Sequence, residues 1–379
     1  MPSKHARLSP SSSHIWLHCP PSVRLSEKYE DQTSIYAEEG TEAHSLCEYE
    51  LRKMLGENVA DPRPELKFYD QVMQDSANGY VETVMSIYEE LKASDESAAV
   101  FVEQQVDFSE YVPGGFGTSD AVVIGGTTMV ICDFKYGSGV EVSATENTQL
   151  MCYALGCYLA ISPIYDISGI RLVIYQPRLS NYSVWECSAD ALISWAEEEL
   201  RPKAKLAEAG EGTFAAGEWC RFCKARHTCR ARSLKNLELA KYDFKLPPEL
   251  SDYEVSDILN LLDDLEKWAS DIREYAVKTI LSGNAIDGWK LVEGRSNRKY
   301  TDEQAVASAV TDAGYDPYEH KVLGITAMTS LLGKKKFNEL LGELVYKPAG
   351  KPVLVRSNDK RPEYSNAKTD FMEVNDNDK

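Results

Sequence analysis

Apolar residues recur at helical spacing in the first quarter of the chain and at strand spacing after it. Residues 34–56 have the period of an amphipathic helix that ends at Gly56, and a second such helix is predicted over 65–93. The pattern then alternates and predicts three strands, over 99–108, 117–126 and 127–137. A Gly-Gly pair between the second and third strands predicts a hairpin. Beyond it the pattern predicts a helix, two strands and a helix, over 145–161, 167–176, 182–188 and 189–209.

The rest of the chain is mainly helical in pattern. Ser251 and Glu254 form a capping box at the start of a long amphipathic helix over 251–283. Three further elements are predicted, a short β segment and two helices, around 289–300, 302–314 and 326–342. The order of elements predicts an α/β protein with N-terminal helices, a sheet flanked by helices and a mainly helical C-terminal region. The polar, acidic end, 366–379, is expected to be disordered.

The composition is that of a globular protein with an acidic balance. The chain has 379 residues, 43% of them hydrophobic, with 41 Lys and Arg against 60 Asp and Glu and a net charge of −19. No apolar run approaches the roughly 18 residues that a membrane span needs. The Ser/Pro-rich start lacks the apolar core of a secretion signal, so we expect a cytoplasmic protein without a membrane partner. The acidic balance argues against nucleic-acid binding by bulk charge.

The predicted hairpin carries two acidic residues and a lysine. Asp120 lies on its first strand, and Asp133 and Lys135 end the second. Residues i and i+2 of a strand share a face, so these last two project to one side and Phe134 to the other. Two carboxylates within reach of one cation suit Mg²⁺. An ordinary Asp–Lys ion pair at a strand end is the alternative interpretation of this tripeptide.

Other polar residues extend this set on the neighbouring helices. His44 lies on the helix before the sheet, and Gln149 and Tyr153 share a face of the helix after it because they are four residues apart. In chain order the motifs are Ala43-His44, Gly117-Thr-Ser-Asp120, Asp133-Phe-Lys135 and Gln149-Leu-Met-Cys-Tyr153. This order resembles the RecB-like branch of the PD-(D/E)XK nuclease superfamily, with Asp133 where many members have Glu.

The resemblance implies a restriction-endonuclease-like core, in which a mixed central sheet is flanked by helices. The ligands that it implies for Mg²⁺ or Mn²⁺ are His44, Asp120, Asp133 and the backbone carbonyl of Phe134. Lys135 would be the catalytic lysine, and Gln149 and Tyr153 would position DNA or that lysine. Glu103, on the first strand, is a further carboxylate that could be accessory to the site, although a glutamate at a strand edge is usually just solvated.

Three of the nine cysteines form a compact motif after the predicted core. Cys220, Cys223 and Cys229 are spaced C-x(2)-C-x(5)-C, and thiolates at this spacing converge on a metal. The fourth ligand could be His227, giving a small zinc site, or Cys19 near the N-terminus. Most of the other cysteines are single residues in apolar segments, where we expect small buried hydrophobic side chains. No disulfide framework is expected without a secretion signal.

The segment around Cys19 resembles the start of RecB-like nuclease domains that carry an iron–sulfur cluster, of the CRISPR-adaptation and AddB type. In those domains one cysteine lies far upstream and three follow the core. The resemblance therefore implies a [4Fe–4S] cluster held by Cys19, Cys220, Cys223 and Cys229, and zinc remains the alternative because thiolates bind either. By the loop-closure model for cross-links, a staple of this length would be worth about 5 kcal/mol.

The cysteine segment is also locally basic. Trp219 and Phe222 interleave with cations, a pattern that suits phosphate contacts beside a stacking surface. The residues proposed to contact nucleic acid are Arg221, Lys224, Arg226 and Arg230. Such a run can equally be a solvated face. A second basic run, 334–336, lies in the C-terminal region.

These observations lead to one main hypothesis and two alternatives. We expect a metal-dependent DNA nuclease, an exonuclease in phage recombination, repair or DNA end processing. The alternatives are a catalytically silent DNA-binding or assembly module of the same fold, and a zinc-stapled interaction scaffold. The predicted domains are a nuclease domain over 1–235, an α-rich accessory region over 240–365 and the tail.

Two features of the sequence bear on partners. No Walker A sequence occurs, so unwinding would need a partner helicase. The region from about residue 240 resembles the C-terminal part of an uncharacterised family common in phage and prophage genomes. This likeness suggests phage recombination proteins as partners in a bacterial cytoplasm.

Overall fold

The computed structural model describes most of the chain in five segments and a few single positions. The segments are 6–29, 34–238, 250–293, 300–318 and 322–346, and the single positions lie between 353 and 361. Contacts divide the chain into two units, Met1–Val292 and Glu293–Lys379. The tail predicted to be disordered lies outside the described residues.

In the described segments before the sheet, two α-helices are short and two are long. They are α1 (Ser13–Trp16), α2 (Ser22–Ser26), α3 (Ile35–Met54) and α4 (Gln71–Lys92). The side chain of Ser34 caps α3 by accepting a hydrogen bond from the amide of Ala37. The second long helix starts six residues later than predicted, because Asp70 caps it by accepting a hydrogen bond from the amide of Met73 at 2.8 Å.

The sheet has five strands in the order β1-β2-β3-β4-β5. The strands are β1 (Ala99–Asp107), β2 (Phe116–Gly125), β3 (Thr128–Phe134), β4 (Gly169–Gln176) and β5 (Asn181–Ser188). Among the neighbouring pairs of this sheet, β3 and β4 pair in parallel and the other three pairs are antiparallel. The crossover between β3 and β4 contains α5 (Thr148–Ile161). The predicted hairpin is β2–β3, and Gly126 in its turn has a positive φ of 56° that glycine adopts readily. This mixed sheet flanked by helices confirms the α/β prediction.

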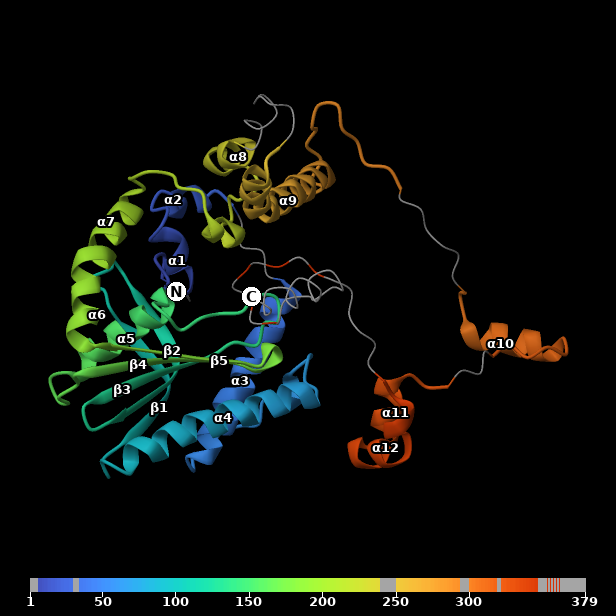
Figure 1. Ribbon diagram of the computed structural model, residues 1–379, viewed down its shortest axis with the longest axis horizontal. Coiled ribbons are helices and arrows are strands. Elements are labelled where there is room, and N and C mark those ends of the chain that lie inside the picture. The colour runs from blue at the N-terminus through green and yellow to red at the C-terminus, as the bar shows by residue number, and fades with distance from the viewer. Residues whose placement is uncertain are drawn as a thin grey trace, which may run out of the picture. The chain divides into compact units, whose positions relative to one another are not determined.

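Alternate residues of the strands pack into two separate cores. On one face, Cys132 and Phe134 of β3 pack beneath α3 and α4. On the other, Ile131 belongs to the core formed with α5 and the helical run that follows β5. These helices cover that face of the sheet (Figure 1). Asp133 is the next residue of that second face, and it is only 2% exposed. The pleat therefore turns this carboxylate toward α5, where Gln149 and Tyr153 lie.

The chain after the sheet is helical, as predicted. The elements are α6 (Ala189–Trp195), a π-helical turn (Ala196–Leu200), α7 (Arg201–Ala209), a 3₁₀ turn (Glu218–Phe222), α8 (Arg230–Leu237) and α9 (Asp252–Leu281). The predicted capping box at the start of α9 is present, because Ser251 and Glu254 exchange side-chain and backbone hydrogen bonds. By contacts α9 belongs to the first unit, which extends to residue 292.

The second unit contains α10 (Glu303–Asp312), α11 (Ile325–Leu332) and α12 (Lys334–Leu341). The prediction of one helix over 326–342 was wrong. Gly333 has a φ of 75° and a ψ of 149°, which ends α11 and caps α12. Of the β segment predicted around 289–300, the described residues show one isolated bridge, between Ile286 and Trp289. Residues 294–299 lie outside the described part. No helix in the described segments has the length and apolar character to cross a membrane.

Candidate functional site

The β2–β3 hairpin opens at one end, and the predicted acidic residues lie there. The ladder ends at the pair Ala121 and Cys132, and the next residues along the two strands are Asp120 and Asp133. Asp120 does not continue the ladder. Its Oδ2 accepts a hydrogen bond from the amide of Phe134 at 2.7 Å, so the carboxylate replaces a backbone partner and fills the opening between the strands.

Lys135 follows β3 and still lies on the predicted side. Its amide donates to the carbonyl of Tyr175 at 2.9 Å, which extends the β3–β4 pairing by one residue. Its Nζ lies 2.9 Å from Oδ2 of Asp133 and donates to Oε1 of Gln149 at 3.1 Å. The amide nitrogen of Gln149 lies 3.5 Å from Oδ1 of Asp133 and donates to the hydroxyl of Tyr153 at 3.1 Å. These four predicted residues therefore form one connected polar chain.

His44 reaches the same place from α3. Its Nδ1 lies 3.3 Å from Oδ1 of Asp120, and its ring packs edge-on against Phe134 with 5.4 Å between ring centres. Asp120 is thus held by the histidine through one oxygen and by the backbone through the other. The structure brings together all six side chains that the four motifs predict.

Burial and charge act against each other at this site. Burial raises the pKa of Asp133, and the ammonium of Lys135 only partly offsets it. Burial also favours the neutral form of Asp120, but His44 and the Phe134 amide hold the pKa of that carboxyl below its usual value. Burial lowers the pKa of Lys135, but Asp133 and Asp120 outweigh it, so the net shift is upward and the ammonium is retained. The two carboxylates are therefore not equivalent.

Glu103, the carboxylate that the sequence suggested as a possible accessory group, lies beside Asp120. In the β1–β2 register it falls opposite Asp120, between the pairs Val102–Ala121 and Gln104–Ser119. Its φ of 50° lies in the left-handed region, which costs a non-glycine residue on the order of 1 kcal/mol. Burial and the nearby Asp120 raise the pKa of Glu103 to about 7. The register of the predicted hairpin, extended to one more strand, is the signal that places Glu103 opposite Asp120.

An open cleft of about 430 Å³ reaches part of this group, and its lining includes His44, Glu103, Asp120 and Lys135 but not the buried Asp133. The donor set suits a hard divalent cation, because it offers carboxylate oxygens and an imidazole. Oδ2 of Asp133 is buried, and the partner that the structure shows for it is the ammonium of Lys135 at 2.9 Å. The residues therefore fit the predicted Mg²⁺ or Mn²⁺. Within the described segments, no group of three or more His, Cys, Asp or Glu side chains is arranged so that it could hold a metal ion without rearrangement.

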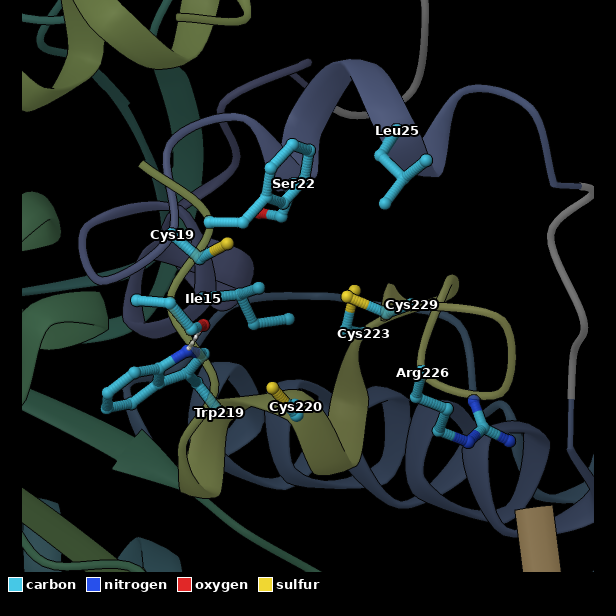
Figure 2. Close-up of a pocket in the computed structure, with 11 residues that line it drawn as sticks. Ile15, Cys19, Ser22, Leu25, Trp219, Cys220, Cys223, Arg226 and Cys229 are labelled. Atoms are coloured by element: carbon cyan, nitrogen blue, oxygen red, sulfur yellow. Dashed lines mark hydrogen bonds between the residues drawn. The ribbon is translucent and has the colours of Figure 1, made fainter. Parts of the chain in front are cut away.

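The four cysteines predicted to share a metal centre line one small cavity. Cys19 comes from the turn after α1, and Cys220, Cys223 and Cys229 come from the segment between α7 and α8. Figure 2 shows their sulfur atoms around a common space, with Cys19 above it and Cys220 below. His227, the other candidate fourth ligand, does not line this cavity; its ring stacks on that of Tyr275.

The cavity favours neutral sulfur as it stands. Burial raises the pKa of the thiols of Cys19, Cys220 and Cys223, and neighbouring thiols raise it further. Metal ligation requires thiolates, so a bound centre would have to supply the compensating positive charge. Four sulfur donors around one cavity fit an iron–sulfur cluster or zinc.

The N-terminal segment that carries Cys19 also touches the polar site. The hydroxyls of Ser13 and Thr148 lie 2.7 Å apart, and Thr148 precedes Gln149 on α5. A Cβ on Gly117 would lie 3.0 Å from both Pro10 and Tyr153, so this segment closes over the strand end beside the tyrosine. The cysteine cavity and the polar site are thus linked by one short stretch of chain.

Comparison with known families places the chain. A model of the family described as Protein of unknown function (DUF2800) matches residues 5–362. The chain belongs to this family. A solved structure titled "Crystal structure of SSO0001" covers 49% of the chain and 95% of its own length, with 13% sequence identity and a TM-score of 0.22. At this TM-score the likeness does not bear on the fold or the site.

In this DUF2800 member the cations of the predicted basic segment differ in their exposure to solvent. Arg221, Lys224 and Arg230 are exposed. Arg226 is half-buried, and its Nε donates to Oδ1 of Asp271 on α9 at 3.1 Å. Arg232 is fully buried and pairs with Asp271 as well. Fewer cations of this segment therefore face solvent than its sequence suggests.

Proposed function

We propose that the chain is a metal-dependent DNA nuclease, and specifically an exonuclease that processes DNA ends. The observation that carries the proposal is the connected chain Asp133–Lys135–Gln149–Tyr153, with Asp120 and His44 beside it. These residues come from four separate elements, and packing alone does not require polar side chains of these types to meet at one strand end. An isolated Asp–Lys ion pair would need neither the histidine nor the glutamine.

The chemistry would be divided between carboxylates and lysine. His44, Asp120, Asp133 and the carbonyl of Phe134 would hold Mg²⁺ or Mn²⁺. Such a cation lowers the pKa of a bound water and stabilises charge on a phosphate. Lys135 is retained as a cation by its carboxylate neighbours, so its ammonium can orient the attacking water or offset negative charge on the phosphate. Gln149 fixes the direction of Nζ through its 3.1 Å hydrogen bond.

The four cysteines would form a structural centre in this enzyme. We propose a [4Fe–4S] cluster held by Cys19, Cys220, Cys223 and Cys229, with zinc as the alternative. Its role would be to tie the N-terminal segment to the end of the core. Because that segment contacts Thr148, the staple would also support the start of α5, which carries Gln149.

The setting that we propose is a bacterial cytoplasm, with a phage or prophage origin and DNA as the substrate. The net charge of −19 predicts weak binding to DNA without the metal and binding that weakens steeply as salt is added. Any unwinding would come from a partner helicase or from phage recombination proteins.

The proposal is tested by digestion of end-labelled single-stranded and double-stranded DNA with Mg²⁺ or Mn²⁺, under anaerobic conditions. We expect cleavage by the wild-type chain and none by Asp133→Asn, which keeps the shape of the side chain and removes its charge. Asp166→Asn is the matched control, because Asp166 is exposed, belongs to none of the four motifs and does not line the cleft. If the wild-type chain cleaves no DNA end, the proposal fails. If Asp133→Asn cleaves as well as the control, the site is wrong.

A further inference from the structure

We infer that a groove between the cysteine segment and α9 binds single-stranded DNA and delivers it to the proposed site. The groove measures about 620 Å³ and shares no lining residue with the cleft over the acidic residues. It lies between the end of α2, the segment that carries Phe222 and His227, and one side of α9. That the strand is delivered to the acidic site rests on the proposed function, whereas binding of the strand in the groove does not.

The groove is positive in a strongly acidic chain. Four cationic side chains line it, from Lys28, Lys224, Arg226 and Lys278, against the two carboxylates of Asp271 and Glu274. Both carboxylates are already paired. Asp271 accepts from Arg226 and Arg232, and Glu274 lies 2.7 Å from Lys278. An excess of cations in a hollow favours a phosphate backbone and steers it there.

Aromatic rings line the same groove. His227 stacks on Tyr275 with 4.8 Å between ring centres and 22° between planes, and Tyr29 meets the histidine edge-on at 5.3 Å. Phe222 is 55% exposed at the rim. Rings beside cations are the elements with which proteins hold unpaired bases, and each stacked base contributes about 1–3 kcal/mol. A duplex hides its base faces, so this lining favours a single strand.

The groove is also connected to the proposed site. Phe222 packs edge-on against His14 of α1 with 5.7 Å between ring centres. The next residue along the chain from His14 toward the N-terminus, Ser13, contacts Thr148 beside Gln149. A single short helix therefore separates the aromatic rim from the helix that positions the lysine. A strand that leaves the groove over Phe222 would pass this helix on the way to the cleft.

The test is fluorescence anisotropy with a labelled oligothymidine and with a duplex of the same length, without divalent cation so that nothing is cut. We expect Tyr275→Ala to weaken binding of the single strand by about tenfold, the loss of one stacked base, and Tyr275→Phe to keep it. Tyr253→Ala is the matched control, because Tyr253 is an exposed tyrosine of the same helix that does not line the groove.

Three outcomes would overturn the inference. They are equal affinity of Tyr275→Ala and Tyr253→Ala for the single strand, preference of the wild-type chain for the duplex, and equal binding of an oligouridine. The proposed function fails separately. If the chain binds the strand through Tyr275 but cuts no DNA when Mn²⁺ is added, the inference about the groove stands and the proposed nuclease activity fails. If the chain cuts DNA but Tyr275→Ala does not weaken binding, the nuclease activity stands and the inference about the groove fails.

Discussion

Arg232 offers the sharpest test of how α9 is held. Its side chain is 1% exposed and pairs with two aspartates of α9, Asp264 and Asp271, which are seven residues apart and share a helical face. The guanidinium also donates to the carbonyl of Arg226 at 3.3 Å. Arg232→Met keeps most of the side chain's volume and removes the charge, so both carboxylates lose this cation at once.

The expected cost follows from the exposure of the partners. Removing one member of a fully buried ion pair costs about 3–5 kcal/mol. Here Asp264 and Asp271 are 30% and 18% exposed, so water can solvate them in part, and Arg226 stays beside Asp271. We therefore expect α9 to lose about 2–3 kcal/mol of protection, which is roughly a 30- to 150-fold change in its opening equilibrium.

Hydrogen exchange followed by mass spectrometry measures this directly. We expect amides of α9 to exchange faster in Arg232→Met, while those of β2 and β3 keep their protection. Arg230→Met is the control, because Arg230 is exposed two residues away on the same helix. Unchanged protection of α9 in a folded Arg232→Met would refute the reasoning that this network holds the helix.

Two further predictions concern the site and the cysteines. Cys19→Ser should lose the bound iron or zinc, measured by elemental analysis and visible absorption, and its free energy of unfolding should fall by up to about 5 kcal/mol. Cys187→Ser is the control, because Cys187 lies outside the cavity, and it should change neither quantity. Equal metal content in the two variants would contradict the assignment. Tyr153→Phe removes the hydroxyl that accepts from the Gln149 amide. It should slow cleavage about three- to tenfold, which is the value of one ordinary hydrogen bond, and leave the stability of the fold unchanged. An unchanged single-turnover rate would exclude a role of Tyr153 in positioning Gln149.

The sequence predicted those contacts of the site that are made between residues close together in the chain. Asp133 and Lys135 meet because a strand alternates its side chains, and Gln149 lies near Tyr153 because a helix repeats every 3.6 residues. The capping box at Ser251 needs only four consecutive residues and was predicted correctly. Asp70 and Gly333 are local signals too, but they compete with an apolar period that continues across them.

Other features depend on residues far apart in the chain, and no local pattern reveals them. Arg226 looked free for phosphate because its partner, Asp271, follows 45 residues later. The sequence left Glu103 between an accessory carboxylate and a solvated strand residue, because its place opposite Asp120 depends on the pairing of β1 with β2. The cavity around Cys19 likewise requires the N-terminal segment to fold back on the end of the core.

The most direct test of the central claim is the single-turnover rate of DNA end cleavage in Lys135→Met. This variant keeps the aliphatic stem and removes the ammonium that lies 2.9 Å from Asp133. We predict a rate about 10²–10³-fold below wild type, the usual loss when one group that stabilises transition-state charge is removed. Lys205→Met, an exposed lysine on α7, should cleave at the wild-type rate. Equal rates in the two variants would contradict the assignment of this site.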